Sequence, residues 1–283
     1  ASMGSQYRPG DGRNKYGYLA ALRYSRGWNI TDQDWRTFNR GGESIHDWDL
    51  EWNDDETNLG VFLNLGADFA ENHRIGSTTM LIRDTLDSTR IRDGYNADWD
   101  ENVERTELIW LERQMLNQQF TGEHDFSNFA GLGLDWQYTY SAGDREEPDR
   151  RGYIYEVGDE GELFLPLNQS TNNSRTWSDM EDTTHDASFD LSLPLALFEK
   201  TRLKAGAKWV DKSRDFEMRR FTLEGNPFNV DPAILTRPLE EILNDTHINT
   251  DEFRLIETTR PSDTYDAEQT IYGTYGMADM RVS

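Results

Sequence analysis

Hydrophobic and polar residues alternate strictly along several stretches of this chain, and residues 132–155 show it most clearly. Leu132, Leu134, Trp136, Tyr138 and Tyr140 fall on one side, and Gly133, Asp135, Gln137, Thr139 and Ser141 fall on the other. A β-strand points successive side chains to opposite faces, so this pattern predicts a strand with one apolar and one polar face. The alternation then gives way to a dense charge run from Asp144 to Arg151. This change is typical of a strand that leaves a membrane and enters water.

The same alternation recurs along the chain and predicts nine strands. Within residues 103–123 the pattern is less pure, and a helix remains an alternative because four apolar side chains there also fit a helical stripe. Asp231 and Pro232 form a helix start signal, which predicts a short helix within 232–244, interrupted near Pro238. The predicted strands cover residues 1–8, 14–30, 56–69, 74–92, 103–123, 130–155, 177–197, 201–222 and 264–282.

The predicted connections alternate in length. Short links at 9–15, 70–74, 125–131 and 198–202 alternate with long ones at 31–55, 93–102, 144–180 and 223–262. Within the first long link, a strand extension over 45–52 is an alternative. Outer-membrane barrels combine short periplasmic turns with long extracellular loops. We therefore predict an all-β fold, an antiparallel transmembrane β-barrel segment whose bilayer edge lies near Tyr140–Gly143. Single-chain bacterial barrels have an even strand number, so nine strands predict a part of a larger barrel.

Composition narrows the classes of partner. The net charge is −24, from 29 Lys and Arg against 53 Asp and Glu, so the chain repels nucleic acid, and we expect no DNA or RNA partner. Hydrophobic residues make up only 35%, yet 9 Trp, 12 Tyr and 13 Phe argue against a disordered chain. The absence of cysteine excludes disulfides and thiolate metal sites. No apolar run is long enough to predict a transmembrane helix.

One part of the chain resembles a known family. The order of its features is a strand ending in Gly122-Glu123-His124, the alternating run from Leu134-Asp135-Trp136, then Ser141-Ala142, a charged run with Glu147-Pro148-Asp149, and Tyr153 and Tyr155. In this order they resemble the barrel of TonB-dependent outer-membrane receptors, and the segment around 64–76 looks like a barrel hairpin of the same receptors.

The resemblance implies a barrel of about 22 strands with a plugged lumen in the outer membrane of a Gram-negative cell. It implies that residues 1–283 are a partial receptor barrel, and that the plug domain, the TonB-contacting segment and the remaining strands are absent. It further implies uptake of a scarce nutrient, such as a ferric siderophore, haem, cobalamin or a glycan. The partners would be membrane lipid, the small-molecule or glycan ligand, and TonB with its inner-membrane complex.

Aromatic and acidic side chains gather in the predicted extracellular loops. Aromatic rings stack on sugars or flat chelates, so the sequence predicts a ligand mouth, with the nearby acids favouring cationic ligands. The predicted ligand-binding residues are Trp35, Trp48, Trp52, Tyr95 and Trp99. The candidate ligands for Ca²⁺, which prefers carboxylate oxygens, are Asp47, Asp49, Asp98 and Asp100, although solvation of the loops is the simpler interpretation of these acids.

No catalytic constellation stands out, and we expect neither an enzyme nor a resident cofactor apart from the Ca²⁺ candidate. The five histidines lie far apart without metal-ligand spacing. Four aromatic residues are instead predicted at the lipid interface, namely Trp136, Tyr138, Tyr140 and Trp209. Because a soluble β-sandwich also alternates, a secreted sandwich or adhesin-like carbohydrate-binding module remains the alternative.

Overall fold

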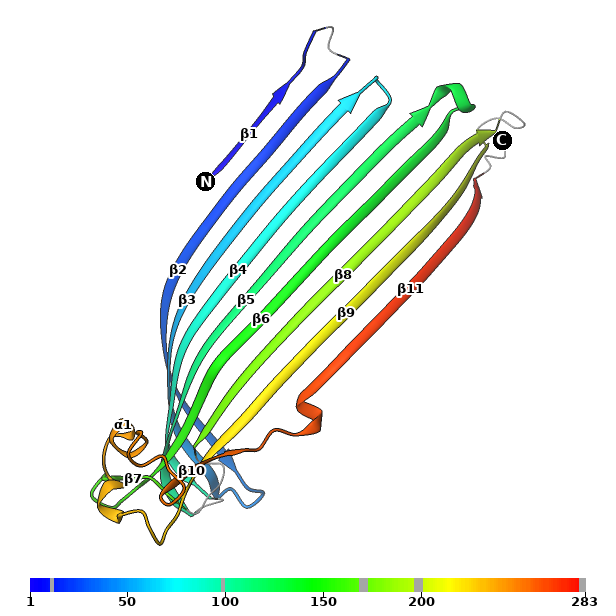
Figure 1. Ribbon diagram of the computed structural model, residues 1–283. Coiled ribbons are helices and arrows are strands. Elements are labelled where there is room, and N and C mark those ends of the chain that lie inside the picture. Colours follow the sequence, from blue (N-terminus) through cyan, green and yellow to red (C-terminus); the bar gives the residue numbers. More distant parts are fainter. Residues whose placement is uncertain (11–12, 98–99, 168–172, 196–200, 280–283) are drawn as a thin grey trace.

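The computed structural model describes residues 1–10, 13–97, 100–167, 173–195 and 201–279, and the description below refers to these. They form a single antiparallel sheet of eleven strands in the order β1-β2-β3-β4-β5-β6-β8-β9-β10, with β7 beside β6 and β11 beside β9 (Figure 1). The all-β prediction is confirmed. Within these residues β1 and β11 do not pair with each other, so the sheet is open.

The long strands follow one another in space as they do in sequence. Each pairs with the next over most of its length, which leaves few backbone groups without a ladder partner. The strand bounds are β1 Ser2–Tyr7, β2 Lys15–Phe38, β3 Ser44–Phe69, β4 His73–Asn96, β5 Glu101–Phe126, β6 Leu132–Val157, β7 Leu163–Phe164, β8 Ser174–Leu195, β9 Thr201–Gly225, β10 Phe253–Glu257 and β11 Thr264–Asp279.

Nine of these strands correspond to the predicted ones, but their far ends reach further than predicted. The loop predicted over 31–55 is wrong, because β2 continues to Phe38 and β3 begins at Ser44, whereas the alternative of a strand extension over 45–52 is confirmed. The loop predicted over 93–102 shrinks in the same way, and 103–123 lies in a strand rather than a helix. The strand pattern was missed over 31–38 because the side chains there are mostly polar on both faces. The predicted turn 198–202 lies mostly outside the described residues.

A bulge marks the charged run that ends the opening stretch. Strand β6 does not stop at Gly143 but continues to Val157, and its pairing shifts between Glu147 and Arg150. Asp149 sits there with φ +60° and accepts hydrogen bonds from Arg151 and Arg175. One extra residue in β6 reverses which face its later side chains occupy.

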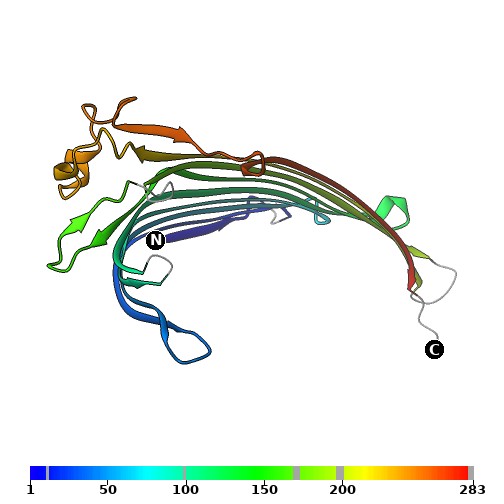
Figure 2. The ribbon, with the colours of Figure 1, turned by 90° about the horizontal axis from the view of Figure 1, so that it is seen from below.

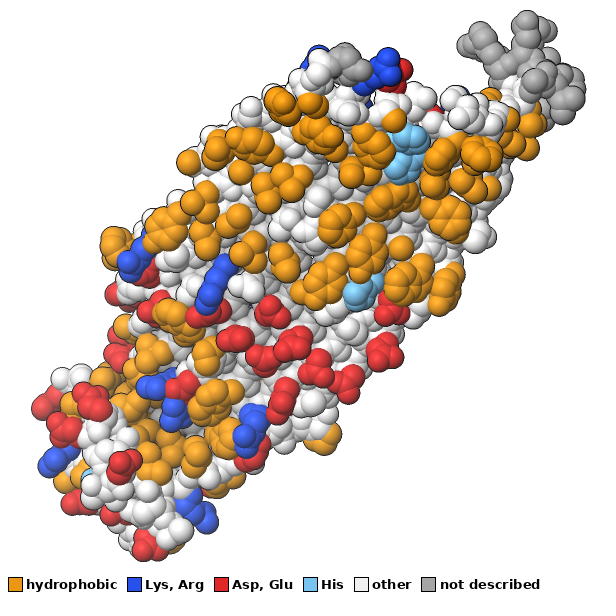
Figure 3. All heavy atoms as spheres, turned by 45° about the horizontal axis from the view of Figure 1, so that its top comes forward, with side chains coloured by type: hydrophobic (Ala, Val, Ile, Leu, Met, Phe, Trp, Pro, Cys, Tyr) orange, Lys and Arg blue, Asp and Glu red, His pale blue; other side chains and the backbone are white. Residues whose placement is uncertain are grey.

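The two faces of the sheet differ in chemistry. Figure 2 shows that the sheet bends into an arc, and Figure 3 looks onto its convex face. Over the half near the short turns, that face carries large apolar side chains that are exposed or half-buried, here called the apolar belt. It comprises Tyr18, Leu22, Val61, Leu63, Leu65, Ile75, Phe120, Leu134, Trp136, Tyr138, Phe189, Leu191, Leu203, Trp209 and Tyr272.

Aromatic rings and histidines group at two places within the belt. Near the turns, His73 contacts His124 through their Nδ1 atoms at 3.1 Å, and the Trp136 indole donates to His124 Nε2 at 3.1 Å. Further along the strands, the hydroxyl of Tyr138 lies 2.9 Å from His185 Nδ1, and the His185 ring stacks with Trp209. Rings with one polar end suit a boundary between apolar and aqueous surroundings.

Beyond the belt, the convex face carries a band of carboxylates, which appears in red beside the orange belt in Figure 3. Asp144, Glu181, Asp215 and Asp266 are successive cross-strand partners, and like charges placed opposite each other repel. A side-chain hydrogen bond with Asp266, followed by burial and neighbouring charge, raises the pKa of Asp215 above its ordinary value. The next row holds Glu112, Glu146, Asp179 and Glu217.

The main buried core lies at the far end of the sheet, not beneath it. Residues 226–252, together with β7 and β10, form a cap on the convex side, packed on Tyr153 and Tyr155 (Figures 1 and 2). The predicted short helix is confirmed in two pieces, a 3-10 turn Pro232–Ile234 capped by Asp231 and the helix α1 Leu239–Ile242 after Pro238. The buried centre comprises Leu165, Val230, Ile234, Ile242 and Phe253.

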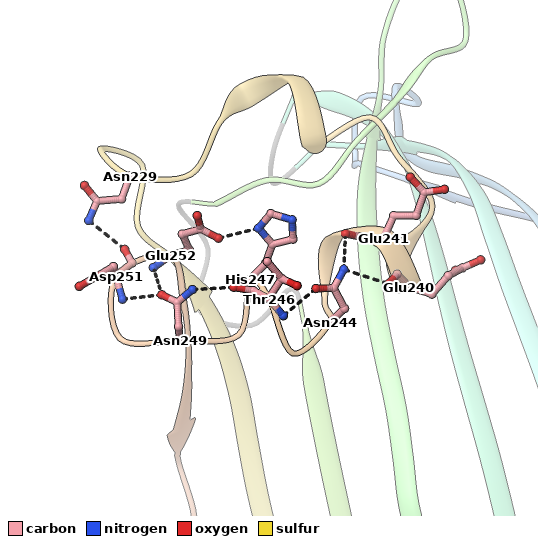
Figure 4. A network of polar contacts seen from close by, with 9 residues as sticks. All are labelled: Asn229, Glu240, Glu241, Asn244, Thr246, His247, Asn249, Asp251 and Glu252. Carbon is pink, nitrogen blue, oxygen red and sulfur yellow. Dashed lines mark hydrogen bonds and ion pairs between the residues drawn. The ribbon is translucent and has the colours of Figure 1, made fainter.

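Side-chain amides hold the rest of the cap in place of regular secondary structure (Figure 4). The Asn249 oxygen accepts from the backbone amides of Asp251 and Glu252, both at 2.8 Å, and the Asn244 oxygen accepts from Thr246 N at 2.9 Å. His247 Nδ1 lies 2.6 Å from a Glu252 carboxylate oxygen. Asparagine is well suited to such local turns because its side chain mimics a backbone amide.

The cap should respond to small changes in its centre. Ile242 is fully buried, at 0% exposure, so Ile242→Val should destabilise the cap by about 0.5–1.5 kcal/mol. Hydrogen exchange of the cap amides measures this, and the matched control Ile248→Val, at a 38% exposed position, should change exchange far less. Equal effects at both positions would contradict a core centred on Ile242.

Candidate functional site

The concave face carries an aromatic wall at the far ends of β2 and β3. The register pairs Trp35 with Trp48, and His46 follows two residues before Trp48 on the same face. The Trp35 and His46 rings stack with centroids 6.3 Å apart and planes 10° apart, and the His46 and Trp48 centroids lie 5.9 Å apart. These three residues form a continuous ring surface on a sheet whose other polar-face positions are mostly small or hydrophilic.

A pocket of about 200 Å³ lies against this wall. Cross-strand pairing brings Arg92, Arg105 and Ile154 into one row, on β4, β5 and β6. Val103, only 1% exposed, packs with Trp48 and closes the apolar side of the pocket. Its lining comprises Trp35, His46, Trp48, Arg92, Asn96, Val103, Arg105 and Ile154.

A glycine leaves room between the wall and Val103. Gly94 is the register partner of both Trp48 and Val103, and its φ is +146°. A Cβ atom there would lie 1.9 Å from the Asp47 backbone oxygen, so no other residue fits without movement of the backbone. The pocket therefore depends on a position that only glycine occupies comfortably.

Buried carboxylates and arginines adjoin the pocket. Glu107, with its side chain 8% exposed, pairs with Arg105 at 2.8 Å and with Arg150 at 3.0 Å. Glu147, at 6%, pairs with Arg145 at 3.0 Å and with Arg150 at 3.6 Å. Burial raises the pKa of Glu107, but the charges of Arg105, Arg150 and Arg92 and the Arg150 hydrogen bond outweigh it, so the pKa lies below its ordinary value.

Several polar atoms on the aromatic wall lack a partner within the described part of the chain. They are Thr37 Oγ1, His46 Nδ1, Trp52 Nε1 and Arg90 Nε, all shielded from solvent. The Arg90 guanidinium lies over the Trp52 ring, 5.3 Å from its centroid. Buried polar groups normally find hydrogen-bond partners, so these four atoms are open to water or to a ligand.

The predicted site residues divide between the two faces. Trp35, Trp48 and Trp52 lie together on the concave face, in strands rather than in the loop predicted for them. Tyr95, Asp47 and Asp49 occupy the convex face, with Asp47 paired to Arg36 at 2.7 Å. The Tyr95 hydroxyl donates to Asp100 at 2.7 Å, which raises the pKa of Tyr95. Asp98 and Trp99 lie outside the described residues.

The carboxylates proposed for Ca²⁺ do not assemble where the structure describes them. Within those residues, no group of three or more His, Asp or Glu side chains is placed to hold a metal ion. Sequence reasoning missed Arg92, Arg105 and Val103, because only the register between strands brings them to the wall. Trp48, Leu50 and Trp52 follow one another at a spacing of two residues, which is the period of a strand face. This spacing could have shown that Asp47 and Asp49 lie on the opposite face.

Comparison with known proteins finds no match among family models, curated proteins or solved structures. In the described residues, no helix has the length and apolar character needed to cross a membrane.

Proposed function

We propose that this chain is part of the β-barrel of an outer-membrane uptake receptor, with its convex face toward lipid and its concave face toward a polar lumen. The apolar belt is the observation that carries this proposal. Leu22, Leu65 and Phe189 are 52%, 45% and 46% exposed, and all described strands belong to one sheet, so no second layer covers them. Soluble monomers rarely expose a contiguous apolar surface of this extent.

The dimensions of the belt suit a bilayer. On β6 it runs from Leu134 to Ala142, after which Asp144 begins the acidic band. A tilted strand crosses the hydrocarbon with roughly 9–11 residues, which agrees with this span. The aromatic and histidine groups within the belt have the composition expected near the two interfaces.

The opposite face at the same height is polar and internally hydrogen-bonded. Asn64 donates to Thr78 at 2.7 Å, and Asn117 donates to Ser141 at 2.7 Å. Such a face suits a water-filled or plugged lumen. Open sheet edges are not tolerated in lipid, so the edges that β1 and β11 leave unpaired in the described sheet would need partner strands, as in a barrel of about 22 strands.

In this proposal the complete receptor takes up a scarce nutrient at the outer membrane of a Gram-negative cell, driven through TonB and its inner-membrane complex. The strands beyond the belt stand in water outside the bilayer and carry the aromatic pocket. Ligand would meet this pocket first, while the belt anchors the sheet. Transport itself would belong to the whole receptor.

Quenching by brominated lipid tests the membrane placement. In vesicles with bromine on the acyl chains, tryptophan fluorescence should fall, and Trp136→Phe together with Trp209→Phe should remove most of that loss. Trp28→Phe is the matched control, because Trp28 lies on the same face at 74% exposure but next to Asp55, beyond the belt. A protein that stays monomeric in plain buffer and shows no quenching would favour the secreted carbohydrate-binding alternative.

A further inference from the structure

We propose that the concave-face pocket binds a planar organic anion, an aromatic ring bearing a carboxylate or a similar acidic group. That this anion is the cargo of an uptake receptor rests on the proposed function, whereas its binding to the pocket does not. An anionic ligand has the opposite charge to the cationic ligand that the sequence predicts. In this site Arg92 and Arg105 bind the acidic group of the ligand. Trp35, His46 and Trp48 contact its ring.

Strand alternation decides which charged side chains reach the pocket. The acids nearest to the tryptophans in sequence, Asp47 and Asp49, point to the convex face, so they do not contribute to the pocket. The register brings Arg92 and Arg105 to it instead. A chain of net charge −24 thus concentrates guanidinium groups at one aromatic surface.

The arginines at the pocket are not fully neutralised. Arg92 forms no ion pair among the residues that the structure describes, although the Glu107 carboxylate acts on its charge from farther away. Glu107 lies beside Arg105, but it also neutralises Arg150. An anion would therefore meet positive charge that Glu107 offsets only in part, and guanidinium groups bind carboxylates through short, paired hydrogen bonds.

The shape of the pocket favours a flat ring. Three neighbouring rings form one wall, and Val103 and Ile154 form an apolar side. His46 Nδ1, which has no partner among the described residues, offers a further hydrogen-bonding atom. The volume of about 200 Å³ is below the roughly 300–1,000 Å³ typical of sites for drug-sized molecules. The pocket therefore accepts a flat moiety of one or two rings, either a small ligand or one arm of a larger one.

A series of probes with one ring system and three charges tests this inference. The full chain in phosphatidylcholine nanodiscs is titrated with 2-naphthoate, 2-naphthylmethanol and 2-naphthylmethylammonium, with empty nanodiscs measured in parallel. We expect 2-naphthoate to bind at least about tenfold more tightly than the neutral alcohol, equivalent to one charge-assisted contact. The ammonium should bind most weakly.

Variants assign the effect to the pocket. Arg92→Glu should reverse the order of the charged probes, and the milder Arg92→Gln should abolish the preference for naphthoate without attracting the ammonium. Arg36→Glu is the matched control, because Arg36 lies on β2 at the same end of the sheet as Arg92 but on the opposite face. Trp35→Leu should weaken all three probes alike, whereas Trp28→Leu should leave them unchanged.

The outcomes separate this inference from the proposed function. If acyl-chain bromine quenches the tryptophans but the three probes bind equally or not at all, the anion site is wrong and the membrane placement stands. If naphthoate binds selectively and Arg92→Glu reverses the order in a protein that needs no lipid, the site stands and the receptor is wrong. Equal changes in Arg92→Glu and Arg36→Glu would also overturn the pocket assignment.

Discussion

Replacing Leu63 with arginine is expected to destabilise the lipid-embedded protein by about 2–4 kcal/mol. Leu63 lies on the convex face of β3, midway along the belt between Leu59 and Ala67, and its side chain is 36% exposed. In lipid, this exposure is to hydrocarbon, and an arginine at the middle of a bilayer loses its hydration. Urea unfolding in phosphatidylcholine vesicles, followed by tryptophan fluorescence, measures the change.

Ile30→Arg provides the matched control for this substitution. Ile30 lies on the same face of the neighbouring strand β2 and is 68% exposed, but its register partner is Asn53, beyond the belt. An arginine there stands in water, so the expected change is within about 0.5 kcal/mol, as for ordinary surface substitutions. If Leu63→Arg is as harmless as Ile30→Arg, the belt does not face lipid and the outer-membrane proposal fails.

The alternation in the sequence was sufficient to predict strands wherever one face is apolar. Residues 58–69 and 132–142 alternate because their convex face is apolar, whereas their concave face carries polar residues and glycine, with Phe62 as the exception. Residues 31–38 carry mostly polar side chains on both faces, so the alternation is lost there although the backbone pairing continues. Residues 46–52 do alternate, but their apolar side chains lie on the concave face instead of the convex one. The cap was predictable only at Asp231 and Pro238, because its other turns depend on asparagine contacts between separate segments.

The aromatic half of the candidate site was predictable, and its charged half was not. Tryptophans are rare enough to attract attention at 35, 48 and 52, whatever the local structure. Arg92 and Arg105 lie far from them in sequence and reach them only through the pairing of β3 with β4 and β4 with β5. Proximity in sequence favoured Asp47 and Asp49 instead, and a single step along a strand is enough to send a side chain to the other face.

Glu107→Gln is expected to lower the free energy of unfolding at neutral pH by about 1.5–3 kcal/mol, the range for hydrogen bonds to charged groups. The substitution keeps the shape of the side chain but leaves Arg105 and Arg150 without their shared negative charge. The matched control is Glu112→Gln, whose pair with Arg83 is more exposed and should contribute under about 1 kcal/mol. Equal losses at the two positions would show that burial of Glu107 does not matter.

The stabilisation by Glu107 should depend on pH. Because the pKa of Glu107 lies below its ordinary value of 4.5, its stabilisation is fully present above that pH and is lost as the pH falls through the folded-state pKa. The difference in stability between the wild type and Glu107→Gln should therefore be constant near neutrality and shrink in acid. A difference that grows in acid would mean that the protonated form of Glu107 is the one stabilised.

The same substitution should act on ligand binding in the opposite direction. Glu107 neutralises part of the charge of Arg105, which lines the pocket, so Glu107→Gln leaves that guanidinium freer to pair with an anion. We expect tighter binding of 2-naphthoate and unchanged binding of 2-naphthylmethanol in a less stable protein. A general loosening of the fold would weaken both probes, so a gain confined to the anion would tie the buried network to the charge of the pocket.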